Sequence, residues 1–135
     1  MNAGADISLL LAQSGIAATG LFFIALGLAA WLVPARAGRF LLAFASTPGM
    51  HFAELALRLL AGSAFILAAP ASAFPRSFHL FGLLLIGTTA VMLLLPWRWH
   101  RRFTERAVPP ALRLLPLIGL VSITAGCLAL WAIFA

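Results

Sequence analysis

Four apolar runs, separated by short polar segments, dominate the pattern of hydrophobic and polar positions along the chain. They cover about residues 15–33, 52–69, 77–95 and 114–134, with Ile7 as an alternative start of the first run. Each run is close to the roughly 20 residues with which a helix crosses about 30 Å of hydrocarbon. The runs do not alternate strictly between apolar and polar residues, as a membrane-spanning strand would. The pattern therefore predicts an all-α membrane protein, one domain over residues 1–135 with four transmembrane helices.

Prolines support these boundaries. Pro34 and Pro96 follow the first and third runs, and Pro109 and Pro110 precede the fourth. A proline lacks the amide hydrogen and disfavours helix at the residue before it, so we expect helices to end or begin at these positions. The first ten residues include an acidic residue and no basic one, so we expect no cleaved signal peptide.

The distribution of charge predicts how the protein lies in the membrane. Only 9% of the residues are charged, and all nine basic residues are arginines. The connection between the second and third runs holds only Arg76, whereas the other eight lie in or beside the other two connections. The positive-inside rule makes those two connections cytoplasmic and both termini periplasmic, in a bacterial-type inner membrane. Seven of the eight are expected to contact anionic lipid rather than nucleic acid: Arg36, Arg39, Arg98, Arg101, Arg102, Arg106 and Arg113.

The two basic connections are themselves amphipathic. RAGRFLLAF, beginning at Arg36, predicts a short helix on the membrane surface that starts at Pro34. WRWHRRF, beginning at Trp97, is its counterpart. Because indole rings favour the headgroup boundary, all four tryptophans are expected to be interfacial anchors: Trp31, Trp97, Trp99 and Trp131.

Two matching motifs predict an internal duplication. The pattern P-x-R-x-x-R occurs at Pro34 and again at Pro96, 62 positions later, and the motif ALRLL occurs at Ala56 and at Ala111. We interpret the chain as a tandem repeat of a helix–basic loop–helix hairpin, over residues 15–70 and 77–134. Two such repeats would have the same orientation and be related by an axis along the membrane normal. The arginine of each ALRLL, Arg58 or Arg113, is expected to reach the lipid phosphates from the start of its helix.

One polar cluster is a candidate for chemistry. His51, Glu54 and Arg58 are spaced so that a helix places them on one face, with Glu54 and Arg58 in the favourable order for an ion pair. Ionisable groups near a membrane helix are functional candidates. The alternative is an interfacial salt bridge that neutralises the start of the second helix. No catalytic residues, metal site or cofactor are predicted, although a quinone is compatible with this face.

Small residues recur along three of the runs. They form a stripe on the fourth run, a pair one heptad apart on the first run, and a further position on the third run. Small residues at such positions allow helices to approach closely. They are expected to be either the packing seams of a four-helix bundle or a docking face for a partner. The helix-packing positions are Gly20, Gly27, Gly82, Gly119, Ser122 and Gly126.

The segment GLFFIALGLAAWLVPARAGRFLLAFASTPGMHFAELALRLLAG resembles the opening half of DoxX-like membrane proteins. That family has a glycine-rich first helix, a connection with a Gly-Pro or Pro-Gly turn and a second helix with a glutamate and glycines. The matching positions are Gly20, Gly27, Pro48, Gly49, Glu54 and Gly62. The resemblance covers about half of the chain, mainly residues 15–70. It implies a small four-helix inner-membrane protein, in some members associated with redox or quinone-linked partners.

We therefore expect a protein that acts by association rather than as an enzyme. It would be an accessory or scaffold subunit of a larger membrane complex or homo-oligomer, or a lipid-contacting protein. One alternative is a small homodimeric transporter or channel, because coupled transport needs an ionisable group in the membrane. Another is a quinone-linked enzyme component that uses the face of His51, Glu54 and Arg58.

Overall fold

The computed structural model describes residues 2–135, and this part of the chain is helical throughout, without strands. Four of its helical segments are long and apolar enough to cross a membrane, as the sequence predicted. Two shorter helices connect them at one end. The elements are α1 (Ala3–Leu32), α2 (Pro34–Ala43), α3 (Pro48–Ala68), η1 (Ala69–Ala71), α4 (Pro75–Leu94), α5 (Trp97–Ala111), η2 (Leu112–Leu114) and α6 (Leu115–Phe134).

The first helix begins much earlier than the apolar run suggested. Asn2 caps it, and the Asn2 side chain accepts a hydrogen bond from the Gly4 amide at 3.1 Å. The hydroxyls of Ser8 and Ser14 donate to carbonyls one turn back, at 2.9 Å and 2.8 Å. These polar residues lower the local hydropathy without interrupting the helix, because their hydrogen bonds stay within it. α1 has 30 residues and is about 45 Å long at 1.5 Å per residue.

The second spanning helix also begins earlier, at Pro48 rather than near Phe52. Thr47 is its N-cap, and its hydroxyl oxygen accepts a hydrogen bond from the Met50 amide at 3.1 Å. Pro48 fits the first helical position, where an amide hydrogen would have no intrahelical partner. Arg58 consequently lies about 15 Å along the axis of α3, near its middle rather than at its start.

Both basic connections form amphipathic helices. α2 begins at Pro34, as predicted. α5 is longer than expected, because Pro109 and Pro110 lie inside its last turn instead of marking a break before the final span. At these positions the prolines forfeit only the hydrogen bonds to the carbonyls of Glu105 and Arg106, two exposed residues that water can reach. The short turn η2 then leads directly into α6.

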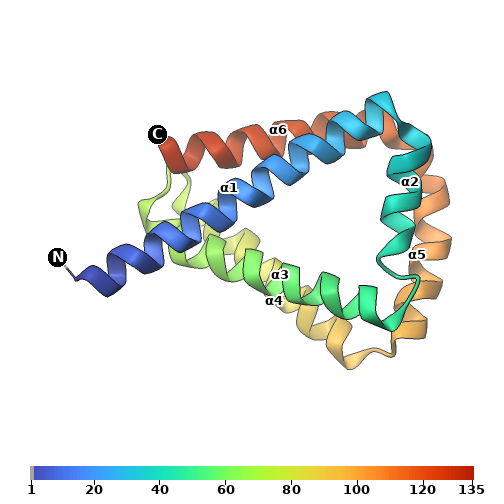
Figure 1. The fold of residues 1–135 in the computed structure, drawn as a ribbon, viewed down its shortest axis with the longest axis horizontal. Helices are drawn as coiled ribbons and strands as arrows, with labels where there is room; N and C mark the ends of the chain where they lie inside the picture. The colour runs from blue at the N-terminus through green and yellow to red at the C-terminus, as the bar shows by residue number, and fades with distance from the viewer. Residues whose placement is uncertain (1) are drawn as a thin grey trace.

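The four spans form two pairs that make a V. α1 packs mainly along α6, and α3 along α4. The pairs converge at the end that carries both termini and diverge toward the end that carries α2 and α5 (Figure 1). We call the latter the basic end, because α2, α5 and η2 hold seven arginines there, all of them exposed.

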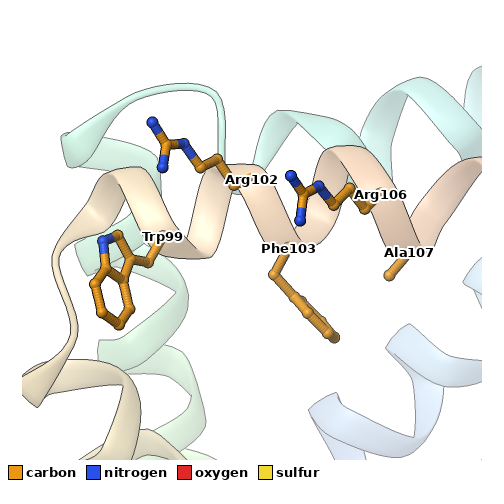
Figure 2. A pocket seen from close by; sticks show the side chains of 5 residues that line it. All are labelled: Trp99, Arg102, Phe103, Arg106 and Ala107. Atoms are coloured by element: carbon orange, nitrogen blue, oxygen red, sulfur yellow. The ribbon is translucent and has the colours of Figure 1, made fainter.

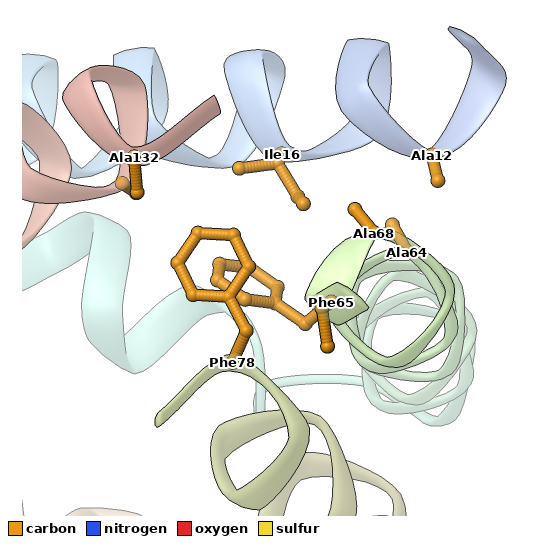
Figure 3. Packing of buried hydrophobic residues seen from close by; sticks show 9 residues of the cluster. Ala12, Ile16, Ala64, Phe65, Ala68, Phe78 and Ala132 are labelled. Atoms are coloured by element: carbon orange, nitrogen blue, oxygen red, sulfur yellow. The ribbon is translucent and has the colours of Figure 1, made fainter. Parts of the chain in front are cut away.

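The largest buried cluster lies where the two pairs converge. Ile16 of α1 and Ala132 of α6 are fully buried against Phe65 of α3 and Phe78 of α4 (Figure 3). The rings of Phe65 and Phe78 meet edge to face with centroids 4.8 Å apart. The amide of Ala73 also donates to the carbonyl of Ala132 at 3.0 Å, which ties the α3–α4 connection to the end of α6.

Glycines allow close contact within each pair. A Cβ at Gly82 would lie 2.6 Å from the carbonyl oxygen of Gly62, across the α3–α4 seam. In the α1–α6 seam, a Cβ at Gly126 would lie 2.5 Å from the carbonyl oxygen of Gly20. These contacts need residues without side chains on both helices. Gly27 and Gly119 form a second such contact, and the Ser122 hydroxyl donates to the Phe23 carbonyl at 2.7 Å.

The two seams correspond to each other under the predicted repeat. Gly20 and Gly82 are 62 positions apart, the spacing of the two P-x-R-x-x-R motifs, and their facing glycines, Gly126 and Gly62, are 64 apart. Exchanging the two halves of the chain therefore exchanges the α1–α6 seam with the α4–α3 seam. This correspondence is the one expected of parallel repeats, and it supports the predicted duplication. It places Arg58 at the position of Ser122 rather than Arg113, so the two ALRLL motifs are not equivalent in the structure.

Candidate functional site

The predicted polar face of α3 lies at the basic end, against α4 and α5. His51 faces α5, and its Nδ1 atom is 2.7 Å from Nδ1 of His100. Glu54 lies one turn further along α3, with one carboxylate oxygen 3.6 Å from Nε2 of His100. Arg58 is a further turn along, 3.8 Å from the other carboxylate oxygen. The three residues thus form one polar cluster with His100, a residue that the sequence analysis had not assigned to it.

The guanidinium of Arg58 is held by α4. Its Nε donates to the hydroxyl of Thr89 at 3.0 Å, and one terminal nitrogen donates to the hydroxyl of Thr88 at 2.5 Å. Thr88 and Thr89 lie about 9 Å and 7.5 Å before the end of α4 at Leu94. This differs from the expectation that Arg58 reaches the lipid phosphates, because two of its donor nitrogens bond to side chains of α4 within the span.

Burial makes this cluster different from a surface ion pair. His51 is only 2% exposed and Thr89 is fully buried, while the side chains of Glu54 and Arg58 are 22% and 27% exposed. Within residues 2–135, Oε2 of Glu54 is buried without a hydrogen-bond partner. A buried carboxylate oxygen without a hydrogen bond destabilises the folded state unless a nearby positive charge compensates. Arg58 supplies that charge.

The hydrogen bonds of the two histidines define a consistent arrangement of protons. If His51 donates from Nδ1 to Nδ1 of His100, then His100 carries its proton on Nε2, which faces the carboxylate of Glu54. Both imidazoles are neutral in this arrangement. The hydrogen bond between the histidines and the 3.6 Å contact of His100 with Glu54 thus bring three titratable groups together, from two helices.

The donor atoms are arranged for hydrogen bonding rather than for metal coordination. Two imidazole nitrogens on one zinc ion would lie roughly 3.3 to 4 Å apart, farther than the 2.7 Å between the histidines. In the described chain, no group of three or more histidine, cysteine or acidic residues is placed to hold a metal ion. The side chains of the cluster contact one another, and none of them lines the apolar groove between α4 and α6.

This apolar groove lies elsewhere, near the end with the termini. It has a volume of about 370 Å³ between α4 and α6, with Phe65 of α3 and Phe23 of α1 also lining it. Phe78 and Phe81 line it from α4, and Leu128 from α6. Its lining is almost entirely apolar, with Ser77 as the one hydroxyl-bearing side chain. Hydrocarbon chains, rather than polar substrates, suit such a lining.

The remaining predicted residues lie in two settings. The glycines and Ser122 lie in the α1–α6 and α3–α4 seams, inside one chain. Two tryptophans make backbone hydrogen bonds at the basic end, Trp31 to the Pro116 carbonyl at 2.9 Å and Trp97 to the Ala45 carbonyl at 3.2 Å. Trp131 packs against Phe74 at the opposite end, and Trp131 and Trp99 are both more than half exposed, at 56% and 57%.

Two kinds of signal would have identified the missing members of the cluster. Thr88 and Thr89 are the adjacent hydroxyl residues in the third apolar run, and they lie toward the same basic end as Arg58. An arginine inside a span needs acceptors on a neighbouring helix, so they were its natural partners. His100 offered a weaker signal, because its pairing with His51 depends on the path of α5.

Comparisons of the chain with family models, with curated proteins and with solved structures find no match. The resemblance to DoxX-like proteins therefore remains a prediction. Of its matching positions, Gly20 and Gly62 lie in the two helix seams and Glu54 lies in the polar cluster.

Proposed function

We propose that this chain is a small, non-catalytic subunit of the inner membrane that acts by associating with other membrane components. The observation that carries this proposal is how little of each span is covered by the rest of the chain. In the most apolar 18-residue stretch of α3, 33% of the residues are buried, and in the other three spans no more than 22%. Most of each span is therefore available to lipid or to helices of a partner.

The small size of the parts outside the spans also supports association. Apart from α2, α5 and a few turns, the described residues belong to spanning helices, so little remains to form a separate domain with its own pocket. The two helix pairs meet mainly at one end (Figure 1). Such an open arrangement offers partner helices two flanks to pack against, on α4 and on α6.

Photo-crosslinking in native membranes tests this proposal. A photoreactive amino acid is placed in turn at exposed positions of the spans, such as Leu21, Leu84 and Leu128. We expect crosslinks to one defined protein, or to a second copy of this chain, from one contiguous face. Ile16 is fully buried and serves as the control, with crosslinks only inside the chain. If every exposed position gave lipid adducts alone, the proposal would fail.

The polar cluster favours a second candidate, a small channel or transporter that moves protons without a coupled substrate. Glu54 is partly buried, Arg58 lies near the middle of α3, and His100 connects this interior to the basic end. Intramembrane ionisable residues of this kind occur along proton and ion paths. The two proposals differ in whether the isolated chain moves anything across a membrane.

Proton flux into vesicles that contain the purified chain separates the two candidates. A transporter is expected to take up protons under an imposed membrane potential, and Glu54→Gln would abolish that uptake. Glu105→Gln is the matched control, because Glu105 is exposed and pairs with Arg101 at 2.9 Å on the surface of α5. No uptake by the wild-type chain would exclude uncoupled proton transport and favour association.

A further inference from the structure

A groove on α5 combines exposed aromatic rings with exposed arginines. It has a volume of about 400 Å³ and is lined by Trp99, Arg102, Phe103, Arg106 and Ala107. Trp99 is 57% exposed and Phe103 is 69% exposed, although both are large apolar side chains. Figure 2 shows their rings on one side of α5, with the guanidinium of Arg102 extending from the other. Such a helix lies at a membrane surface, with its rings in the hydrocarbon and its charges among the headgroups.

The corresponding helix of the first half, α2, fills its aromatic face internally. Phe40 stacks between Phe22 of α1 and Phe44, with ring centroids 6.0 Å and 4.9 Å away. Trp99 and Phe103 of α5 make no comparable ring contact within residues 2–135. The aromatic face of α2 is thus partly covered by its own chain, with Phe40 still 40% exposed, whereas Trp99 and Phe103 of α5 are 57% and 69% exposed.

The two helices also differ in charge at equivalent positions. With the 62-residue spacing of the basic motifs, Arg102 and Arg106 correspond to Phe40 and Phe44 of α2. The other arginines that match, Arg98 and Arg101, have counterparts in α2 at Arg36 and Arg39. Arg102 and Arg106 are therefore an extra pair of charges that the second half alone carries.

This extra pair has no acidic partner inside the described chain. Glu105 pairs with Arg101 at 2.9 Å, and Glu54 pairs with Arg58. Arg102 and Arg106 are four positions apart on a helix, so they lie on one face with their Cβ atoms about 6 Å apart. From such positions two long arginine side chains can both reach one phosphate group and donate several hydrogen bonds to its oxygens.

We infer that this face of α5 binds one anionic phospholipid, with its phosphate held by Arg102 and Arg106 and its acyl chains against Trp99 and Phe103. An anionic phospholipid has a negatively charged phosphate next to apolar acyl chains, and this face of α5 offers a surface for each. A soluble phosphate compound would use the arginines but leave the two rings uncovered. The inference does not depend on the proposed association function, because it concerns one helix and one lipid.

Native mass spectrometry of the full-length chain in mild detergent tests the site. The probes are phosphatidylglycerol, phosphatidylcholine and glycerol phosphate. We expect selective binding of phosphatidylglycerol, and an affinity loss on the order of tenfold or more in the double variant Arg102→Gln, Arg106→Gln. The Trp99→Ala, Phe103→Ala variant is also expected to bind more weakly, because the acyl chains lose their contact surface.

Two control variants separate this site from general charge attraction. Arg36→Gln, Arg39→Gln removes the same net charge from α2 and is expected to change affinity by less than about threefold. Arg102→Lys, Arg106→Lys keeps the charge and is expected to bind more tightly than the glutamine pair but more weakly than the wild type, because an ammonium group lacks the planar donor fork of a guanidinium. All four arginines are exposed, so circular dichroism should show the fold unchanged. Equal losses from both glutamine pairs, equal binding of phosphatidylcholine, or equal binding of glycerol phosphate would each overturn the inference.

Discussion

Arg58 shows how one charged residue is accommodated inside a membrane span. Its stem begins near the middle of α3, and its guanidinium is shared between the hydroxyls of Thr88 and Thr89 and the carboxylate of Glu54. Each partner lies toward the basic end, in the direction in which helix side chains lean. The positive charge is thus neutralised by protein groups instead of by lipid phosphates.

Removing Arg58 is expected to destabilise the fold, because it leaves the carboxylate of Glu54 without its positive partner. Arg58→Met should lower the free energy of unfolding by about 1–3 kcal/mol. Arg113→Met is the control, since Arg113 is exposed and makes no ion pair within residues 2–135, and it should have little effect. Thermal unfolding in mild detergent followed by circular dichroism measures both.

The double variant Glu54→Gln, Arg58→Met provides a further check at the same site. Because it removes both charges, it is expected to regain part of the stability that Arg58→Met loses. A single variant as stable as Arg113→Met, or a double variant less stable than the sum of its parts, would contradict the role given to the pair.

Sequence reasoning could place three residues of the cluster on one face, but it could not find their partners. The spacing of His51, Glu54 and Arg58 follows from helical periodicity alone. Their contacts with His100, Thr88 and Thr89 depend on which helices pack together, and two other helices supply those residues. The spacing of residues along one helix does not indicate which other helices pack against it.

At the scale of the helices, the two seams are set by glycines. Gly82 approaches α3 closely enough that an added methyl group would collide with the backbone of Gly62 and with the side chain of Ile66. Gly87 lies on the same helix with no atom within 4 Å of such a group. One helix therefore contains a glycine that packing requires and another that it does not.

Alanine at these two glycines should have opposite effects on stability. Gly82→Ala is expected to cost roughly 1–3 kcal/mol, because α3 and α4 must move apart. Gly87→Ala is expected to be neutral or to stabilise by up to about 1 kcal/mol, since alanine favours helix. Unfolding by denaturing detergent, followed by circular dichroism, compares them. An equal loss of stability in both variants would mean that close packing in the α3–α4 seam does not require Gly82.

Most of the helices could be predicted from the sequence because each span is largely apolar and has a proline near at least one of its ends. The start of α1 was predicted too late, because polar residues such as Ser8 and Ser14 lower the local hydropathy. Their hydroxyls donate to carbonyls of the same helix and do not interrupt it. A second error arose at Pro109 and Pro110, which a helix tolerates in a last turn with exposed residues. The V arrangement was not predictable, since it depends on the choice of seams.

At the scale of the molecule, seven of the eight exposed arginines gather at the basic end, and both termini lie at the other end (Figure 1). The positive-inside rule predicts that the basic end is cytoplasmic. Since both ends of the chain lie together, one labelling experiment tests the whole topology. It uses single cysteines in a Cys127→Ser background, because Cys127 is free and exposed on α6.

A membrane-impermeant maleimide should label Ala135→Cys in intact cells. Arg98→Cys on α5 should react only after the membrane is permeabilised, since the positive-inside rule places it in the cytoplasm. The readout is the mass increase of the purified protein after labelling. The reverse pattern would invert the predicted orientation while leaving the fold as described.

The two equivalent seams of this chain differ in what surrounds them. At the 64-residue spacing of the facing glycines, His51, Glu54 and Arg58 correspond to Leu115, Ile118 and Ser122. Two identical half-length chains would have to display such a polar cluster twice, on opposite flanks. A single chain displays it once, so the molecule has a front and a back within the plane of the bilayer. Any component that recognises this cluster would then join the protein in a ratio of one to one.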